Sequence, residues 1–320
     1  MLVFFFRHFL LTECRGDEEV SFRDVENGMA HTRKGYDKIT ACCELAISEG
    51  WAFCWIDTCC IDKSSSAELS EAINSMFEWY RKAAVCYVYL DTDIKGDYPT
   101  ADDLRKGRWI HRGWTLQELI APTWVSIYTM HWQYCGSRYE LAGQLHEATG
   151  IDLQVLQRKS KFGLDLSRFS IATRMSWASQ RETTRPEDTA YSLFGIFGVH
   201  LSPIYGEGGE KAFMRLQEEI IKTSMDLSIL AWDAPFVEGD GSEARGLGGL
   251  AKSPTYFRSD LSIVGSRKRV TPFSITNKGL NVTLPVLKFM DRADFIVVLP
   301  NCRMENDYTC LLYTSPSPRD

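Results

Sequence analysis

The first 130 residues alternate between amphipathic stretches and short runs that are apolar throughout. Apolar residues at helical spacing predict one helix that ends near Gly50 and a second helix over residues 65–82. Continuous apolar runs at 51–57, 83–90 and 124–130 predict buried strands. Strands that are apolar on both faces and separated by amphipathic helices are typical of a parallel sheet covered on both sides. The pattern therefore predicts a doubly wound α/β domain at the start of the chain.

The first fourteen residues are unusually apolar, and Arg7 and His8 interrupt them. A helix that spans a membrane needs about 20 apolar residues. This shorter run also has no basic start and no small-residue cleavage site of the kind that marks a signal peptide. We therefore expect Met1–Arg15 to supply a buried strand, and we expect no membrane association.

The pattern changes twice beyond the α/β domain. Residues 131–227 are predicted to be mostly helical, with one helix that starts after Thr184 and runs to about Phe197. Residues 228–232 predict a strand, and alternating segments between residues 273 and 299 predict antiparallel β structure. A further helix is predicted from apolar residues on one face, namely Ala212, Phe213, Leu216, Ile220 and Ile221.

Composition and charge restrict the class of partner. The 320 residues include 36 Lys+Arg and 42 Asp+Glu, for a net charge of −6, and the longest basic run is Arg267–Arg269. Proteins that bind nucleic acid neutralise phosphates with clustered basic residues, so this class of partner is excluded. The ten cysteines show no paired C-x-x-C zinc spacing, which predicts reduced thiols, a cytoplasmic location and no metal site.

The last residues, 310–320, resemble an in-frame translation of a sequencing adapter. We expect this tail not to be native and exclude it from the fold. On that expectation the β-rich part at 228–309 is an incomplete domain.

Candidate chemistry lies where the predicted strands end, because ligands of such sheets bind outside the carboxyl ends of the strands. Asp57 ends the first apolar run, and the acidic loop Asp91–Asp103 follows the second. Trp114 and Glu118 are four residues apart, on one face of a helix. A carboxylate beside an aromatic ring suits chemistry at a sugar carbon, where an anion stabilises an oxocarbenium-like transition state. The alternative is structural: Trp114 belongs to the core, and Glu118 pairs with Arg112 or Arg108.

Five sequence blocks follow one another along the first part of the chain: Gly35–Ile39, Trp55–Lys63, Ser70–Met76, Tyr80–Tyr87 and Arg112–Leu119. In this order they resemble the heterokaryon incompatibility (HET) domain of filamentous fungi. The resemblance covers roughly residues 15–125, and residues 174–209 resemble the segment that follows HET domains. Membership implies a role in non-self recognition, in which unlike partners trigger cell death after hyphal fusion.

The HET domain is in turn similar to Toll/interleukin-1 receptor (TIR) domains, some of which cleave NAD at the bond between nicotinamide and ribose. The segment Trp114-x-x-x-Glu118-Leu119 resembles the TIR segment that carries the catalytic glutamate. The resemblance implies that Glu118 is catalytic, that Trp114, Asp57, Asp17 and Arg112 bind NAD as substrate, and that no cofactor is required.

One departure concerns the first strand, which in the family reads close to Tyr-Ala-Ile-Leu-Ser-His-x-Trp-Gly. Here Phe9–Arg15 occupies that place and matches neither the Ser-His pair nor the tryptophan. Two hypotheses therefore remain: an enzyme that cleaves NAD, and an interaction module without chemistry. The implied partners are other incompatibility proteins or a second copy of the chain.

The predicted organisation has four parts. The fold class is α/β, with a TIR- or flavodoxin-like parallel sheet flanked by helices, followed by a helical segment and a partial antiparallel β domain. The parts are a HET domain at 1–130, a helical HET-associated region at 131–227, the partial β-rich domain at 228–309 and the tail at 310–320.

Overall fold

The computed structural model divides the chain into two compact units, and each is described by itself. The first unit comprises Met1–Leu164, Arg181–Thr184 and Tyr191–Pro203, and the second comprises the segments between and after them. The chain therefore passes from one unit to the other several times, at positions other than the predicted boundaries. The structure describes residues 9–12, 19–94, 96, 98–159, 165–232, 250–257, 263–265, 274–277, 279–283, 286–288, 294–304 and 310–316.

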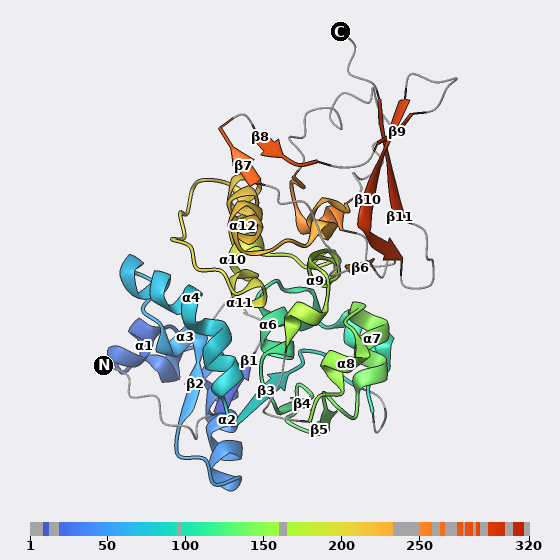
Figure 1. The fold of residues 1–320 in the computed structure, drawn as a ribbon. Coiled ribbons are helices and arrows are strands. Elements are labelled where there is room, and N and C mark those ends of the chain that lie inside the picture. Colours follow the sequence, from blue (N-terminus) through green and yellow to red (C-terminus); the bar gives the residue numbers. More distant parts are fainter. Residues whose placement is uncertain are drawn as a thin grey trace. The chain divides into compact units, whose positions relative to one another are not determined.

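The first unit is built around a five-stranded mixed sheet with the order β2-β1-β3-β4-β5 (Figure 1). The pairs β1·β2, β1·β3 and β3·β4 are parallel, as predicted, whereas β4·β5 is antiparallel. Only a short connection separates β4 from β5, too short for the crossover that a parallel pair needs. This hairpin replaces the helical start predicted after residue 130. The strands are β1 (Phe9–Thr12), β2 (Cys54–Ile56), β3 (Val85–Tyr89), β4 (Val125–Tyr128) and β5 (Tyr134–Ser137).

Helices accompany this sheet along the chain, so the predicted α/β class is confirmed. The strand expected near the start of the chain is also confirmed, because β1 pairs with both β2 and β3 inside the sheet. The helical segments are α1 (Phe22–Glu26), η1 (Ala30–Thr32), α2 (Tyr36–Ser48), α3 (Asp57–Cys60), α4 (Ser66–Lys82), α5 (Ala101–Lys106), η2 (Trp109–His111), α6 (Thr115–Ile120), α7 (Ala142–Thr149), α8 (Leu153–Leu156) and α11 (Phe194–Phe197).

Alternate strand residues contact different helices, which places helices on both faces of the sheet. Tyr87 of β3 belongs to an apolar cluster with Cys42 and Ala46 of α2. On the other face, Trp55 of β2 packs edge to face against Trp79 and Tyr80 of α4, with ring centroids 5.5 and 6.2 Å apart. Successive side chains of a strand point to opposite faces, which is why strands that are apolar throughout were read correctly as buried.

Residues 191–203 complete the first unit by packing on α4. The Asn74 side chain donates to the carbonyl of Leu201 at 3.0 Å and accepts from the Leu201 N–H at 3.1 Å. Gly195 of α11 lies so close to Phe77 that an added Cβ would be 2.0 Å from the Phe77 Cβ. The sequence predicted one helix from residue 184 to 197, but the structure has α10 (Asp188–Tyr191) and α11. Two turn residues, Ser192 and Leu193, separate these helices.

We expect Asn74→Leu to destabilise the protein by about 2–3 kcal/mol, because both backbone groups of Leu201 lose their partner in a partly buried place. Chemical denaturation followed by circular dichroism measures the change. Asn74→Asp is the matched control: it still accepts from the N–H of Leu201 and should cost less. Equal stability of Asn74→Leu and the unaltered protein would contradict this account of the contact.

The second unit begins with helices that one aspartate connects. Asp226 accepts hydrogen bonds from the backbone of Ser228 at 2.9 Å and of Ile171 at 2.8 Å. The first bond caps the 3₁₀ helix η4, so the strand predicted at 228–232 is wrong: local capping favours a helical turn. The apolar face predicted for α12 is confirmed, because its five residues are buried. These segments are η3 (Leu166–Arg168), α9 (Ile171–Ser176), α12 (Gly209–Thr223), η4 (Leu227–Leu230) and η6 (Pro254–Tyr256).

The predicted antiparallel β structure is present in the second unit (Figure 1). Strand β10 pairs antiparallel with β6, β9 and β11, and β7 pairs with β8. Strand β11 lies in the tail that the sequence excluded from the fold, and its backbone pairs with β10. The strands are β6 (Ile263–Gly265), β7 (Ser274–Thr276), β8 (Gly279–Asn281), β9 (Val286–Lys288), β10 (Asp294–Met304) and β11 (Cys310–Pro316). Within the described residues, no helix has the length and apolarity to cross a membrane.

Candidate functional site

The predicted catalytic carboxylate, Glu118, lies in α6, a short helix whose six residues are all buried. The Thr115 hydroxyl fixes the start of this helix through contacts with the carbonyl of Trp109 at 2.6 Å and that of Arg112 at 2.8 Å. Glu118 is 8% exposed. It is therefore a buried charge, and burial of a charge is costly unless opposite charge or hydrogen bonds compensate.

The charge of Glu118 acts on three buried groups. Burial raises the pKa of Tyr80 well above its usual value, and the Glu118 charge raises it further. Burial also raises the pKa of the Cys86 thiol, and the charge of Glu118 raises it further. Burial lowers the pKa of Arg181 to about 10, and the carboxylate of Glu118 acts in the opposite direction. Glu118 thus sits between α4, β3 and the segment that contains Arg181.

Arg181 also holds the start of α6 directly. Its Nη1 donates to the carbonyl of Arg112 at 2.9 Å and to the Thr115 hydroxyl at 2.8 Å. The next residue, Glu182, donates its N–H to the carbonyl of His111 at 2.6 Å and accepts from the N–H of Gly113 at 2.8 Å. Residues 181–184 therefore run beside residues 111–113 within the first unit.

Gly113 permits this close approach. A Cβ added there would lie 2.5 Å from the Thr183 methyl carbon and 3.3 Å from the Ser192 hydroxyl. The glycine of the Arg112-Gly113-Trp114 block is thus explained by packing against residues that follow much later in the chain.

Asp57 is the first residue of α3, directly after β2. Its carboxylate forms an ion pair with Lys63 at 3.1 Å, and its side chain is 25% exposed. The charge of Asp57 also raises the pKa of Tyr80, after burial and Glu118. Two of the predicted site residues, Asp57 and Glu118, therefore act on the same tyrosine.

The other predicted residues take different places. Trp114 precedes α6 as its N-terminal cap and is half-buried. Arg112 contributes its carbonyl to the contact with Arg181. Arg108, one of the two partners suggested for Glu118, forms an ion pair with Asp91 instead. Asp17 lies outside the described residues.

Three residues around Glu118 were not predicted: Tyr80, Cys86 and Arg181. Tyr80 belongs to a block that was used to recognise the family, and its place on the face of α4 that meets the sheet was a usable signal. The sequence contains no signal for Arg181, because no spacing or pattern links it to Glu118, which lies more than sixty residues earlier in the chain.

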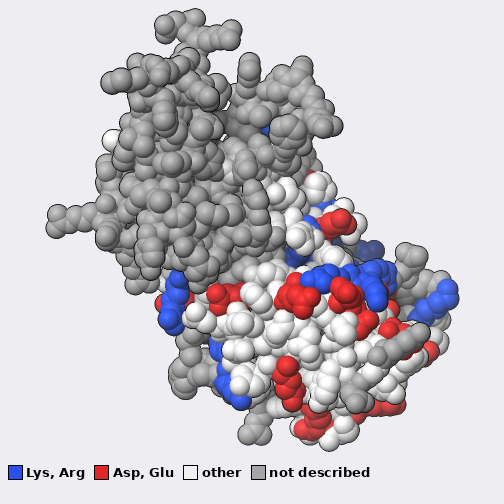
Figure 2. Space-filling model, turned by 90° about the vertical axis from the view of Figure 1, so that its right-hand side faces the viewer, with Lys and Arg blue, Asp and Glu red and all other residues white. Residues whose placement is uncertain are grey.

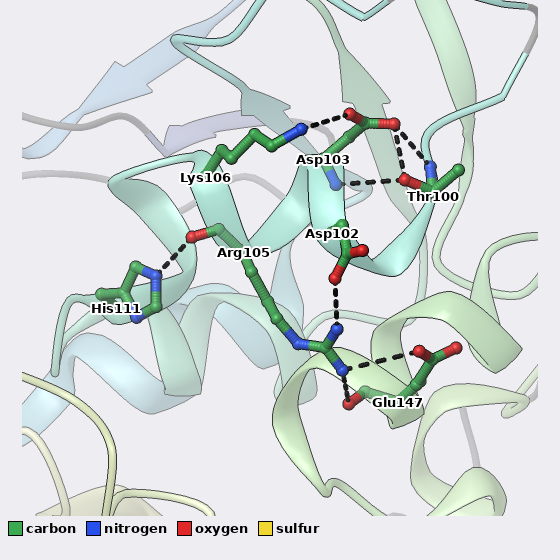
Figure 3. Close-up of polar contacts among 7 residues, drawn as sticks. All are labelled: Thr100, Asp102, Asp103, Arg105, Lys106, His111 and Glu147. Atoms are coloured by element: carbon green, nitrogen blue, oxygen red, sulfur yellow. Dashed lines mark hydrogen bonds and ion pairs between the residues drawn. The ribbon is translucent and has the colours of Figure 1, made fainter.

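The acidic loop before α5 was a second candidate region, and the structure shows its later residues in structural contacts (Figure 3). Thr100 and Asp103 form a capping box at the start of α5. Arg105 bridges to Asp102 at 2.7 Å and to the Glu147 carboxylate at 3.6 Å, which ties α5 to α7. These acids are therefore engaged in capping and ion pairs rather than gathered around a ligand.

Charges of both signs are interspersed over the described face in Figure 2. Blue and red side chains lie next to one another there, and no large basic patch stands out. In the part of the chain that the structure describes, no group of three or more His, Cys, Asp or Glu side chains is arranged to hold a metal ion.

The mixed α/β unit corresponds to a known family. Residues 17–101 match the family model described as heterokaryon incompatibility protein (HET), which ends before α6. The chain is 50% identical over 243 residues to vegetative incompatibility protein HET-E-1 of Podospora anserina. The chain is a HET domain protein, and the resemblance to HET domains stated from the sequence is confirmed.

The match is uneven in coverage. It spans 74% of this chain but 17% of the relative, so the chain corresponds to a small part of that protein's length. No solved structure gives a significant match.

Proposed function

We propose that this chain acts as a signalling module of vegetative incompatibility, in which recognition of a non-self partner leads to cell death. The observation that carries the proposal is the 50% identity over 243 residues with a vegetative incompatibility protein. The partners would be other incompatibility proteins or a second copy of the chain, and the site of action would be the cytoplasm.

We further propose that the first unit is related to TIR and flavodoxin-like folds. The strand order β2-β1-β3-β4-β5 is the order of flavodoxin-like sheets, and its first four strands are parallel. The antiparallel β5 is the difference, because a flavodoxin-like sheet is parallel to its last strand.

The proposed chemistry is cleavage of NAD at the nicotinamide–ribose bond. Glu118 would stabilise the positive charge that develops on the ribose as nicotinamide leaves and water adds. Asp57 and Trp114 would shape the pocket with Asp17 and Arg112, and no further cofactor would be needed. In favour of this proposal, the charges of Glu118 and Asp57 both add to the effect of burial in raising the pKa of Tyr80.

Glu118 is 8% exposed in the described conformation, so NAD cleavage requires a change that exposes this carboxylate. We assign that change to assembly with a partner. The same burial favours the second candidate function, an interaction module in which Glu118 stabilises the fold and performs no chemistry.

Inducible expression of the full chain in fungal hyphae tests the signalling role and separates the two mechanisms. We expect growth arrest from the unaltered chain and none from Glu118→Gln, which keeps the shape and removes the charge. Glu71→Gln, an exposed glutamate on α4, is the matched control and should still arrest growth. Thermal unfolding of each purified variant shows whether Glu118→Gln remains folded.

Each outcome has one meaning. Arrest by a folded Glu118→Gln variant would reject the enzymatic mechanism and support the interaction module. Absence of arrest from every form, including the unaltered chain, would reject the proposed signalling role.

A further inference from the structure

The segment of residues 181–184, which we call the strap, carries the buried cation whose charge interacts with Glu118. The strap belongs to the first unit, but the chain on either side of it, 165–180 and 185–190, belongs to the second. We infer that Arg181 is the positioning residue for Glu118. The inference rests on the proposed role of Glu118. It means that the strap determines the position of the Glu118 carboxylate.

The first argument is electrostatic. Glu118 and Arg181 are each 8% exposed, so neither charge is compensated by water to the usual extent. The charges of Glu118 and Arg181 interact, so removal of either one leaves the other buried charge less compensated, which is more costly than the same loss at an exposed site. Of the groups on which Glu118 acts, Arg181 is the cation, whereas Tyr80 and Cys86 are neutral when protonated.

The second argument is geometric, because Arg181 holds both the charge and the helix that bears it. One nitrogen contacts the Arg112 carbonyl and the Thr115 hydroxyl, where α6 begins. The strap backbone is fixed to residues 111–113 by two hydrogen bonds of 2.6 and 2.8 Å. A shift of the strap therefore moves the start of α6 and the buried guanidinium of Arg181 at the same time.

The third argument is the contrast with the other end of α6. Arg158 donates to the carbonyls of Ile120, Ala121 and Pro122 at 3.3, 3.0 and 2.6 Å. Burial and the charge of Arg81 lower its pKa, and Glu118 is not among the causes. Arg158 thus fixes the end of the helix through carbonyl groups and provides a matched control for Arg181.

The test is a double-mutant cycle on the full chain, read by hydrogen exchange of the α6 amides without NAD. We expect Arg181→Met to accelerate this exchange about tenfold or more. In a Glu118→Gln background the same substitution should accelerate it by no more than about threefold, because the buried anion is absent. Arg181→Lys, which keeps the charge, should restore part of the protection.

Arg158→Met should accelerate exchange by the same factor in both backgrounds. Equal effects of Arg181→Met in the two backgrounds would overturn the inference and leave Arg181 a packing residue. If Arg181→Met alone does not fold, folding of the double variant supports the inference, and failure of both contradicts it. The exchange experiment does not use NAD, so its result is independent of catalysis. If it shows coupling between Arg181 and Glu118 but the chain releases no nicotinamide from NAD, only the catalytic proposal is rejected.

Discussion

Replacement of Arg138 by methionine is expected to destabilise the first unit by about 3–5 kcal/mol, more than any exposed substitution. Arg138 is 2% exposed, and burial lowers its pKa to about 9. Its guanidinium donates hydrogen bonds to several carbonyl groups at the end of α6 and around α8. Methionine has no donor, so it would leave these buried carbonyl groups unsatisfied. The acceptors are the carbonyls of Leu119, Pro122, Thr123, Leu156 and Arg158.

Chemical denaturation of the full chain measures the loss of stability. Hydrogen exchange of the β4 and α6 amides reports on the first unit during this experiment. Arg105→Met is the control: its ion pair with Asp102 is on the surface, and such pairs contribute about 0–1 kcal/mol. Similar losses for the two variants would contradict the structural role of Arg138.

Gly195→Ala is expected to cost about 3 kcal/mol or more, because the added methyl would overlap a buried aromatic residue. The new Cβ would lie 2.0 Å from the Cβ of Phe77 and 2.5 Å from its Cγ, atoms that cannot move without displacing α4. Thermal unfolding monitored by circular dichroism gives the change in stability.

Gly143→Ala is the matched control for the glycine substitution. This residue lies in α7, and an added Cβ meets no atom within 4 Å. Alanine there should stabilise the protein by up to about 1 kcal/mol, since glycine loses more backbone entropy on folding. A Gly195→Ala protein as stable as Gly143→Ala would show that α11 does not pack on α4 as described.

Local pattern was sufficient for strands β2 to β4 and for the long helices α2 and α4, whereas the short helices α1, α3 and α5 were not predicted. The helix predicted at 65–82 is α4, which begins after Ser65 because that side chain accepts from the Glu68 N–H. The three apolar runs are β2, β3 and β4. These predictions succeeded because capping and apolar periodicity act over a few residues, within reach of a sequence pattern.

Features that depend on contacts between distant residues could not be predicted in this way. The sequence does not indicate that Gly195 packs against α4. It also does not indicate that Gly113 packs against the strap. The interleaving of the two units is equally invisible, since no change of composition marks residues 181–184. The predicted strand at 228–232 failed for a related reason: the cap from Asp226 outweighed the apolar character of the residues.

The candidate site shows the same division. Glu118 was found by resemblance and Asp57 by its place after a strand, and the charges of both add to the effect of burial in raising the pKa of Tyr80. Arg181 required the fold, because the cation whose charge interacts with Glu118 comes from a segment between parts of the second unit. This interaction acts through space, and sequence spacing carries no record of it.

The most direct measurement for the central claim is nicotinamide release from NAD by the full chain after forced assembly, for example through an inducible dimerising fusion. The account predicts release from the assembled chain and loss of about 100-fold or more in a Glu118→Gln protein that remains folded. Glu71→Gln should release nicotinamide as the unaltered chain does. Absence of release from every assembled form, or equal release from Glu118→Gln, would contradict the assignment of Glu118 as the functional carboxylate.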